Sequence, residues 1–159
     1  MSCTTRKPRV GETPDVDYHF VSEKAFRAKV EGGEFLEWAE VHGNLYGTPA
    51  SVVDEELASG KDVMLVIDVQ GALRVKEKRP ESVLVFVEPP SFGDLRERLT
   101  GRGTESPDVI EKRIKRAEEE MKCRSRYDYK IINDSLDKAV DELVLIVEGE
   151  RDQSTKKSK

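Results

Sequence analysis

The sequence predicts an α/β protein built on a parallel sheet with helices on both faces, and two observations lead to that prediction. Residues 62–71 contain an apolar, β-branched run that ends on the carboxylate of Asp68, which is typical of a strand buried on both faces. From Lys61 onward, candidate strands and helices alternate, as they do in parallel sheets with right-handed crossovers. We therefore expect Asp68 at the carboxyl edge of the sheet, where α/β proteins bind ligands.

Residues 1–48 predict a small subdomain that is mostly irregular and β. Residues 18–21 and 35–42 have the pattern of extended segments, and Ser22 is suited to cap a short helix between them. Thr48, followed by a proline, offers the N-cap of a further helix that ends at a Ser-Gly pair.

The rest of the chain predicts the core of the α/β fold. Residues 83–87 and 129–132 are candidate strands that would join residues 62–68 in the sheet. Ser91 and Ser106 are candidate N-caps of two helices that lie between these strands in the sequence. Apolar residues at helical spacing mark a closing helix at Leu136, Val140, Leu143, Val144 and Val147.

The composition narrows the classes of function. A chain of 159 residues is long enough for one domain with its own core. Its 32 acidic and 27 basic residues give a net charge of −5, so we expect no binding to nucleic acid or to an anionic membrane. Cys3 and Cys123 lack metal-site spacing and are expected to be reduced thiols, and no segment has the roughly 18 apolar residues of a membrane span. We expect a cytoplasmic protein with a disordered tail over residues 150–159.

A basic loop near the amino end is the first candidate for chemistry. Arg6 and Arg9 lie three residues apart beside hydroxyl groups, and Glu12 and Tyr18 follow them. Guanidinium groups form planar bidentate hydrogen bonds that suit a phosphate monoester. A solvated basic loop is the alternative, and it is favoured for this run taken alone.

A carboxylate and a hydroxyl group form the second candidate. Glu37 can accept hydrogen bonds from N1–H and the 2-amino group of guanine, while the Thr48 hydroxyl group donates to O6. Adenine lacks this pair of donors, so the arrangement would select guanine. An ordinary half-buried strand, in which Trp38 and Tyr46 serve only in packing, is equally consistent with these residues.

Two further features each have two interpretations. Arg98, Arg102 and Arg113 surround a glycine-flanked loop, and mobile arginines can neutralise the charge that spreads over a transferred phosphoryl group. A helix C-cap followed by surface arginines is the alternative. Asp68 suits Mg²⁺, directly or through water, although a lone Asp at the end of a strand is more often a cap.

Several ordered motifs closely resemble the guanylate kinase family over residues 2 to about 147. The motifs are residues 2–9, 11–12, 17–22, 33–39, 43–48, 67–71, 101–104 and 133–134. Their number and order make the resemblance specific and favour the functional interpretation of each feature above. The resemblance implies a P-loop-kinase-like parallel sheet, a small GMP-binding α+β subdomain and an arginine lid. It also implies Mg²⁺-dependent transfer of a phosphoryl group from ATP to GMP, with ADP and GDP as products.

The resemblance implies a role for each matching residue and a division of the chain. GMP would be bound by Ser2, Arg6, Arg9, Glu12, Tyr18, Glu37, Tyr46 and Thr48. The catalytic residues would be Arg9, Arg98, Arg102 and Arg113. ATP would be bound by Arg98, Arg102 and Asn133, and Mg²⁺ would be contacted by Asp68 through water. A single domain would span residues 1–150, with the GMP-binding subdomain at 1–50, the core at 61–97 and 115–149, and the lid at 98–114.

Two departures from the family pattern bear on activity. Val66 occupies the position where the family has an acid two residues before the Asp at the strand end. The family's opening strand, phosphate loop and first helix have no counterpart here, and the 159 residues contain no G-x-x-x-x-G-K-[ST] string. We therefore expect little or no kinase activity from this chain alone. The open sheet would either pair two copies into a homodimer or leave a GMP-binding remnant. A non-catalytic module that binds GMP or a protein partner is the alternative.

Overall fold

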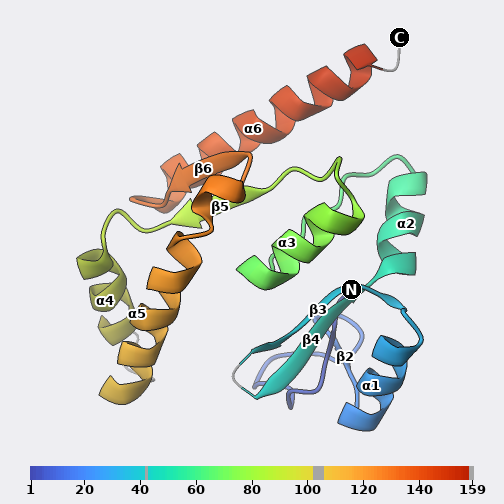
Figure 1. Ribbon diagram of the computed structural model, residues 1–159, viewed down its shortest axis with the longest axis horizontal. Helices are drawn as coiled ribbons and strands as arrows, with labels where there is room; N and C mark the ends of the chain where they lie inside the picture. The colour runs from blue at the N-terminus through green and yellow to red at the C-terminus, as the bar shows by residue number, and fades with distance from the viewer. Residues whose placement is uncertain (42, 102–105, 158–159) are drawn as a thin grey trace. The chain divides into compact units, whose positions relative to one another are not determined.

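The computed structural model describes residues 1–41, 43–101 and 106–157 (Figure 1). The described residues form a mixed α/β fold with two compact units, Met1–Ser82 and Val83–Lys159. In these ranges, no helix combines the length and the apolar character that crossing a bilayer requires. The mixed α/β class is confirmed, whereas the single domain expected from the sequence stays a prediction.

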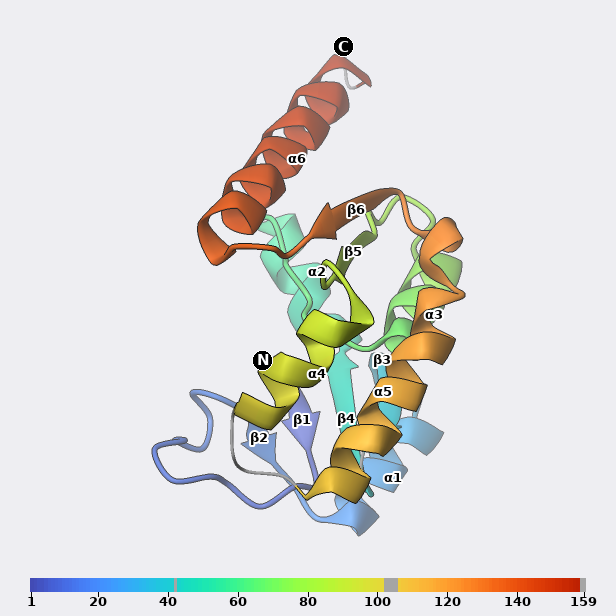
Figure 2. The ribbon, with the colours of Figure 1, turned by 90° about the vertical axis from the view of Figure 1, so that its left-hand side faces the viewer.

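A four-stranded sheet organises the first unit. Its strands are β1 (Cys3–Thr4), β2 (His19–Phe20), β3 (Phe35–Val41) and β4 (Asn44–Pro49), in the order β2-β1-β4-β3 (Figure 2). β1 runs parallel to β2 and antiparallel to β4, and β3 and β4 form an antiparallel hairpin. Gly43 precedes β4 with a φ of +75°, a value that glycine adopts without strain.

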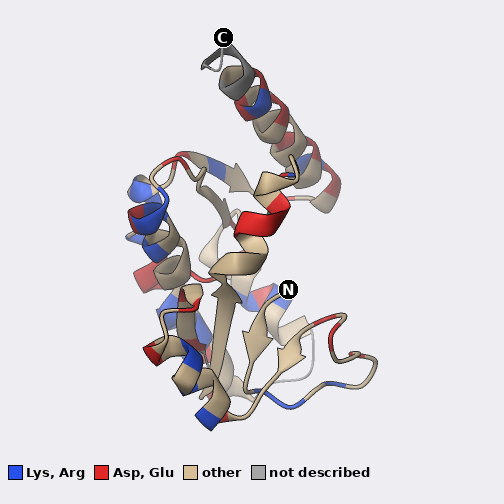
Figure 3. Cartoon of the chain, turned by 90° about the vertical axis from the view of Figure 1, so that its right-hand side faces the viewer, with Lys and Arg blue, Asp and Glu red and all other residues tan. Residues whose placement is uncertain are grey.

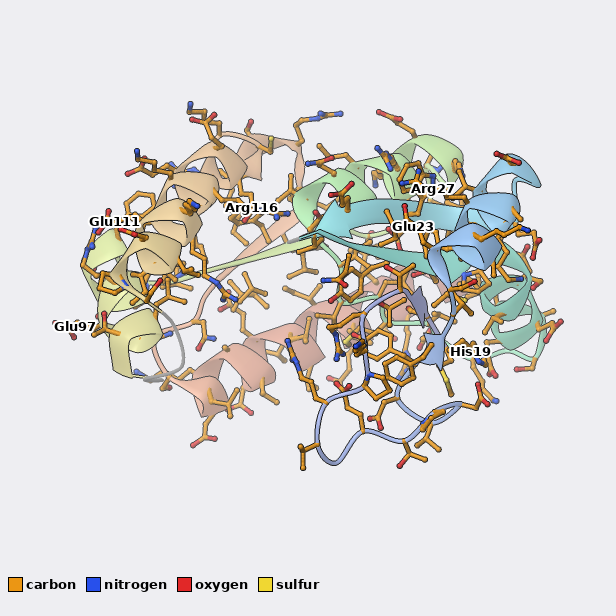
Figure 4. The ribbon with its side chains drawn as sticks, turned by 90° about the horizontal axis from the view of Figure 1, so that it is seen from below. His19, Glu23, Arg27, Glu97, Glu111 and Arg116 are labelled. Carbon is orange, nitrogen blue, oxygen red and sulfur yellow. The ribbon has the colours of Figure 1, made fainter. Side chains whose placement is uncertain are left out.

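Helix α1 (Glu23–Glu31) begins where the sequence predicts. The Ser22 hydroxyl oxygen accepts a hydrogen bond from the Ala25 backbone N–H at 3.2 Å, which satisfies one of the free donors of the first turn. Glu23 and Arg27 lie one turn apart on this helix (Figure 4), with 2.6 Å between Glu23 Oε1 and Arg27 Nη2. The predicted cap and helix are confirmed.

Helix α2 (Ala50–Ala58) begins later than the sequence predicts. Its N-cap is Pro49, so the prediction of a Thr48 cap is wrong. Thr48 lies in β4, and its hydroxyl group donates a hydrogen bond to Glu37 instead of accepting one from a backbone N–H at the start of the helix. The difference arises because a threonine hydroxyl group can form its hydrogen bond either at a helix end or with another side chain, and the sheet places Glu37 beside Thr48.

The largest departure from the predicted fold is at residues 62–68, before helix α3 (Val69–Lys78). The described structure assigns no strand to this segment, so the prediction of a strand buried on both faces is wrong. Every second side chain packs against a core cluster that includes Leu36, whereas Met64 and Val66 are 65% and 94% exposed. An extended backbone turns successive side chains to opposite sides, and only one of the two apolar sides has partners in this unit.

The second unit contains a two-stranded parallel sheet made of β5 (Val85–Glu88) and β6 (Tyr129–Ile132). Both strands lie within two residues of their predicted positions. Helices α4 (Phe92–Gly101) and α5 (Pro107–Met121) lie side by side in both ribbon views (Figures 1 and 2) and bury a small apolar cluster around Leu99. The two helices expected after Ser caps are therefore confirmed.

Helix α6 (Leu136–Lys157) is longer than the sequence predicts, and it follows a short 3-10 helix (Arg124–Arg126) and β6. The prediction of a disordered tail from residue 150 is wrong as far as residue 157, and the last two residues lie outside the described part. The Tyr129 hydroxyl group donates a hydrogen bond to Glu150 Oε1 at 2.6 Å. This contact holds the extended helix to the strand, and the charged helix-forming residues of the tail continue it.

Candidate functional site

The four-stranded sheet has one polar face and one apolar face, because successive residues of a strand point to opposite sides. Cys3 of β1 pairs with Gly47 of β4, and Cys3 belongs to the hydrophobic core of the unit. Glu37 of β3 pairs with Thr48, the next residue along β4, and therefore lies on the other face. The polar face carries Ser2, Thr4, Glu37, Tyr46 and Thr48.

Three of the predicted GMP-binding residues form a hydrogen-bonded chain on the polar face. The Thr48 hydroxyl group donates to Glu37 Oε1 at 2.6 Å, and the hydroxyl oxygens of Ser2 and Thr48 are 3.3 Å apart. Glu37 is only 5% exposed. Burial raises the pKa of Glu37 above its ordinary value, although the hydrogen bond from Thr48 opposes this shift. Such a carboxylate gains from a ligand that supplies further hydrogen-bond donors.

Arg6 and Glu12 form a bidentate pair in the loop between β1 and β2. Arg6 Nη1 and Nη2 donate to the two carboxylate oxygens at 2.9 and 2.8 Å, and the Arg9 backbone N–H donates to Glu12 Oε2 at 2.7 Å. The hydrogen bonds from Arg6, and then the one from Arg9, lower the pKa of Glu12 to about 2. The same carboxylate raises the pKa of Arg6. The pair therefore fixes the Arg6 guanidinium group in one orientation.

Aromatic rings surround this guanidinium group. Its central carbon lies 5.6 Å from the centroid of the Tyr18 ring and 5.9 Å from that of Phe20, within the range of cation–π attraction. The Tyr18 ring meets the Tyr46 ring edge-on, with 6.2 Å between centroids. We call Arg6, its partner Glu12 and the surrounding rings the Arg6 cluster. Because Tyr46 shares a sheet face with Thr48, the Arg6 cluster and the hydrogen-bonded chain occupy the same face.

The side chain of Arg9 is exposed, so the loop fixes its backbone and leaves the guanidinium group in solvent. Basic and acidic residues follow one another along this loop (Figure 3). The structure thus brings together seven of the eight predicted GMP-binding residues through side-chain contacts, and it attaches Arg9 to the group through its backbone. The contacting side chains are Ser2, Arg6, Glu12, Tyr18, Glu37, Tyr46 and Thr48.

Asp68 has the capping contact that the sequence offers as an alternative to metal binding. Its Oδ1 accepts a hydrogen bond from the Gly71 backbone N–H at 2.9 Å, at the start of α3. The negative charge of Asp68 is, after burial, a further cause of the raised pKa of Glu37. Within the described ranges, no three His, Cys, Asp or Glu side chains gather to hold a metal ion. The Mg²⁺ contact of Asp68 stays a prediction.

The residues predicted to meet ATP lie in the second unit. Arg98 on α4 is exposed, and its Nη1 and Nη2 donate to the backbone oxygens of Asn133 and Asp134 at 2.7 and 3.0 Å. Arg113 is half-buried on α5. Arg102 lies outside the described residues. The structure thus brings Arg98 and Asn133 together, and the lid role of the three arginines stays a prediction.

Two residues beside the buried carboxylate were not predicted from the sequence. Arg74 donates to the backbone oxygen of Trp38, and its guanidinium carbon lies 5.3 Å from the centroid of the Trp38 ring. A methyl group on Gly71 would lie 2.7 Å from Glu37 Oε2. Gly71 and Arg74 are three residues apart on α3, and that helical spacing was the available signal that they share a side.

The comparisons with known proteins agree with this arrangement. The family model described as "Guanylate kinase" matches residues 1–150. The guanylate kinase of Halalkalibacterium halodurans is 50% identical over 150 residues, which cover 94% of this chain and 74% of that protein. The guanylate kinase of Dechloromonas aromatica is 51% identical over 147 residues, which cover 92% and 73%.

A solved structure adds evidence from the fold. The crystal structure of guanylate kinase from Anaplasma phagocytophilum superposes with a TM-score of 0.78 at 35% identity, covering 94% of this chain and 73% of that one. The family match, the identities and this superposition extend over the same residues that carry the polar sheet face. The chain belongs to the guanylate kinase family.

Proposed function

We propose that this chain takes part in the transfer of a phosphoryl group from ATP to GMP, which gives ADP and GDP, and that it binds the GMP. The observation that carries the proposal is the hydrogen-bonded chain of Ser2, Thr48 and Glu37 on the same sheet face as the Arg6 cluster. The relatives described above are themselves guanylate kinases.

Glu37 and Thr48 account for the choice of base. The buried carboxylate accepts from N1–H and the 2-amino group of guanine, while the hydroxyl group of Thr48 donates to O6. Without a nucleotide, the Thr48 hydroxyl group donates to Glu37 and satisfies part of the buried charge. Guanine donors replace that hydrogen bond when GMP binds.

Arg6 and Arg9 account for the phosphate group. Glu12 and the rings of Tyr18 and Tyr46 orient the Arg6 guanidinium group in advance, so little conformational entropy is lost when a phosphate binds. The exposed Arg9 side chain is able to close over the phosphate, and Ser2 supplies a hydroxyl donor.

The second unit supplies the residues for ATP. In the proposed reaction, an oxygen of the GMP phosphate attacks the γ-phosphorus of ATP, and no protein nucleophile takes part. Arg98, Arg102 and Arg113 neutralise the charge on the transferred group, and Asn133 lies near the adenine. Asp68 fits a water-mediated contact with Mg²⁺, because its Oδ1 is occupied by the helix cap and Mg²⁺ keeps several waters. The metal ion, when bound, neutralises the phosphate charge.

Titration calorimetry with GMP, IMP and AMP tests the base-reading part of the proposal. We expect GMP to bind most tightly, IMP more weakly because it lacks the 2-amino group, and AMP most weakly because it also lacks N1–H. Glu37→Gln should weaken GMP binding by roughly 10- to 100-fold for each charged hydrogen bond lost. Glu40→Gln is the matched control, since Glu40 lies on the same strand and is exposed. Equal affinity for the three nucleotides would contradict the proposal.

Binding of ATP separates a kinase from a non-catalytic module. Binding of both nucleotides supports the kinase, whereas binding of GMP alone supports a GMP-binding module, and binding of neither contradicts both. A coupled assay of ADP release tests the expectation of little or no turnover by this chain alone. Ordinary turnover would contradict that expectation. The homodimer and the cytoplasmic location stay predictions.

A further inference from the structure

Gly71 stands directly beside the carboxylate of Glu37. It is buried in the first turn of α3, and a methyl group in its place would lie 2.7 Å from Glu37 Oε2 and 3.4 Å from Glu37 Cδ. The φ of Gly71 is not positive, so the backbone conformation of the helix does not itself require glycine. The space that a side chain would fill is occupied by the carboxylate.

Helix propensity alone disfavours glycine at this position. Glycine in a helix costs about 0.5–1 kcal/mol relative to alanine, because the unfolded chain loses more conformational entropy. An alanine would keep the backbone N–H that donates to the capping Asp68 carboxylate. Among the nearest atoms, only Glu37 Oε2 lies closer than 3.4 Å to the added methyl group, and Asp68 Oδ1 lies at 3.4 Å, so the benefit of glycine lies in the position of the Glu37 carboxylate.

The carboxylate is the group that would yield to a methyl group, because it is the far end of a flexible side chain. Glu37 is 5% exposed, and its Oε1 accepts from Thr48 at 2.6 Å, so a displacement of Oε2 also disturbs this hydrogen bond. The backbone of α3 would stay in place. The expected damage is therefore to the orientation of the carboxylate rather than to the fold.

We propose that Gly71 is a positioning residue for guanine recognition, which leaves room for the Glu37 carboxylate to face the N1–H and 2-amino donors of the base. This inference rests on the proposed function, since it assigns Gly71 to the same GMP site. A displaced carboxylate loses hydrogen bonds to guanine, and the loss is greatest for a base that carries both donors. Gly71 thus determines the preference for GMP over IMP as well as the affinity for GMP.

The test compares Gly71→Ala with Gly149→Ala by calorimetry with GMP and IMP and by urea unfolding. Gly149 is the matched control, because it lies in helix α6 and a methyl group there meets nothing within 4 Å. We expect Gly71→Ala to raise the Kd for GMP roughly 10- to 100-fold and to reduce the GMP-to-IMP preference, without lowering stability. We expect Gly149→Ala to leave both affinities unchanged.

The outcomes separate this inference from the proposed function. If the wild-type chain binds no GMP, the proposed function fails and the inference fails with it. If the wild-type chain binds GMP and Gly71→Ala keeps the same Kd and the same GMP-to-IMP preference, only the inference is overturned. If Gly71→Ala does not fold, Glu37→Asp is added to shorten the carboxylate. Recovery of folding in the double variant supports the contact, and failure of both variants overturns the inference.

Discussion

The two faces of the four-stranded sheet both carry buried residues, yet burial has a different effect on each. On the apolar face, the Phe26 ring is fully buried and stacks on Phe35 with 4.6 Å between centroids. On the polar face, Glu37 is 5% exposed and depends on a hydrogen bond from Thr48. Removing apolar surface from water stabilises the fold, whereas removing a carboxylate from water costs free energy. Changes on the first face should alter stability, and changes on the second should alter binding and pH dependence.

The largest expected effect is on the apolar face. Phe26→Ala should lower the free energy of unfolding by about 3–5 kcal/mol, because it removes a fully buried ring and leaves a cavity against Phe35. Urea unfolding followed by circular dichroism measures the change. Leu57→Ala is the control, since Leu57 is 46% exposed on α2 and should cost much less. Equal losses in the two variants would remove the distinction between the faces.

Gly47→Ala should have the next largest effect. The new methyl group would lie 2.9 Å from Phe35 Cδ1 and 3.0 Å from Phe26 Cζ, and stacked rings in a core cannot move aside easily. We expect a loss of about 1–3 kcal/mol, as for other overpacked cores. The same urea experiment on Gly71→Ala compares the two faces directly. There the methyl group meets the flexible Glu37 carboxylate instead of packed rings, so the free energy of unfolding should not fall. A stable Gly47→Ala variant would contradict this account of the apolar face.

The sheet and its polar face are the parts that the sequence predicts best. A hairpin with a short turn fixes the register of its strands, so Glu37 and Thr48 must meet once the turn at Gly43 is recognised. The alternation of the strands then divides polar from apolar residues. The cap Ser22 is equally local, since the residues that it joins are three apart.

The errors arise where a choice between partners depends on distant parts of the chain. An apolar run such as residues 62–68 shows that both sides of a segment are hydrophobic, but it does not show which sides find neighbours. The cap role predicted for Thr48 was wrong because its hydroxyl group has a competing partner, Glu37, on the neighbouring strand. Gly71 was overlooked because its contact with Glu37 spans two elements that are far apart in the sequence.

On the polar face, Glu37→Gln should change how stability depends on pH. Burial raises the pKa of Glu37 in the folded state, so the folded chain binds this proton more tightly than the unfolded chain. Stability therefore falls as pH rises from the ordinary carboxyl pKa, about 4.3, through the raised value. The glutamine variant has no proton to lose, so it does not lose stability in this way. Its free energy of unfolding relative to wild type should therefore rise between the ordinary pKa and the raised pKa of Glu37. Urea unfolding at a series of pH values measures it, and a pH-independent difference would contradict the burial argument.

The smallest effect is expected in the loop beside that face, at Glu12. Hydrogen bonds from Arg6, and then from the Arg9 backbone, lower its pKa to about 2. The paired carboxylate stabilises the fold above its ordinary pKa of about 4.3, and this contribution is lost as pH falls through about 2. An NMR titration of the Glu12 side chain should show the low pKa directly.

Two variants of the same net charge identify the cause of the low pKa. Arg6→Gln removes the bidentate partner and should shift the pKa of Glu12 upward toward its ordinary value. Lys7→Gln removes one positive charge from the same loop but leaves the Arg6 pair intact, so a much smaller shift is expected. Equal shifts would mean that the general charge of the loop holds Glu12 ionised. The bidentate pair of Arg6 and Glu12 would then not be what fixes the Arg6 guanidinium group in the site.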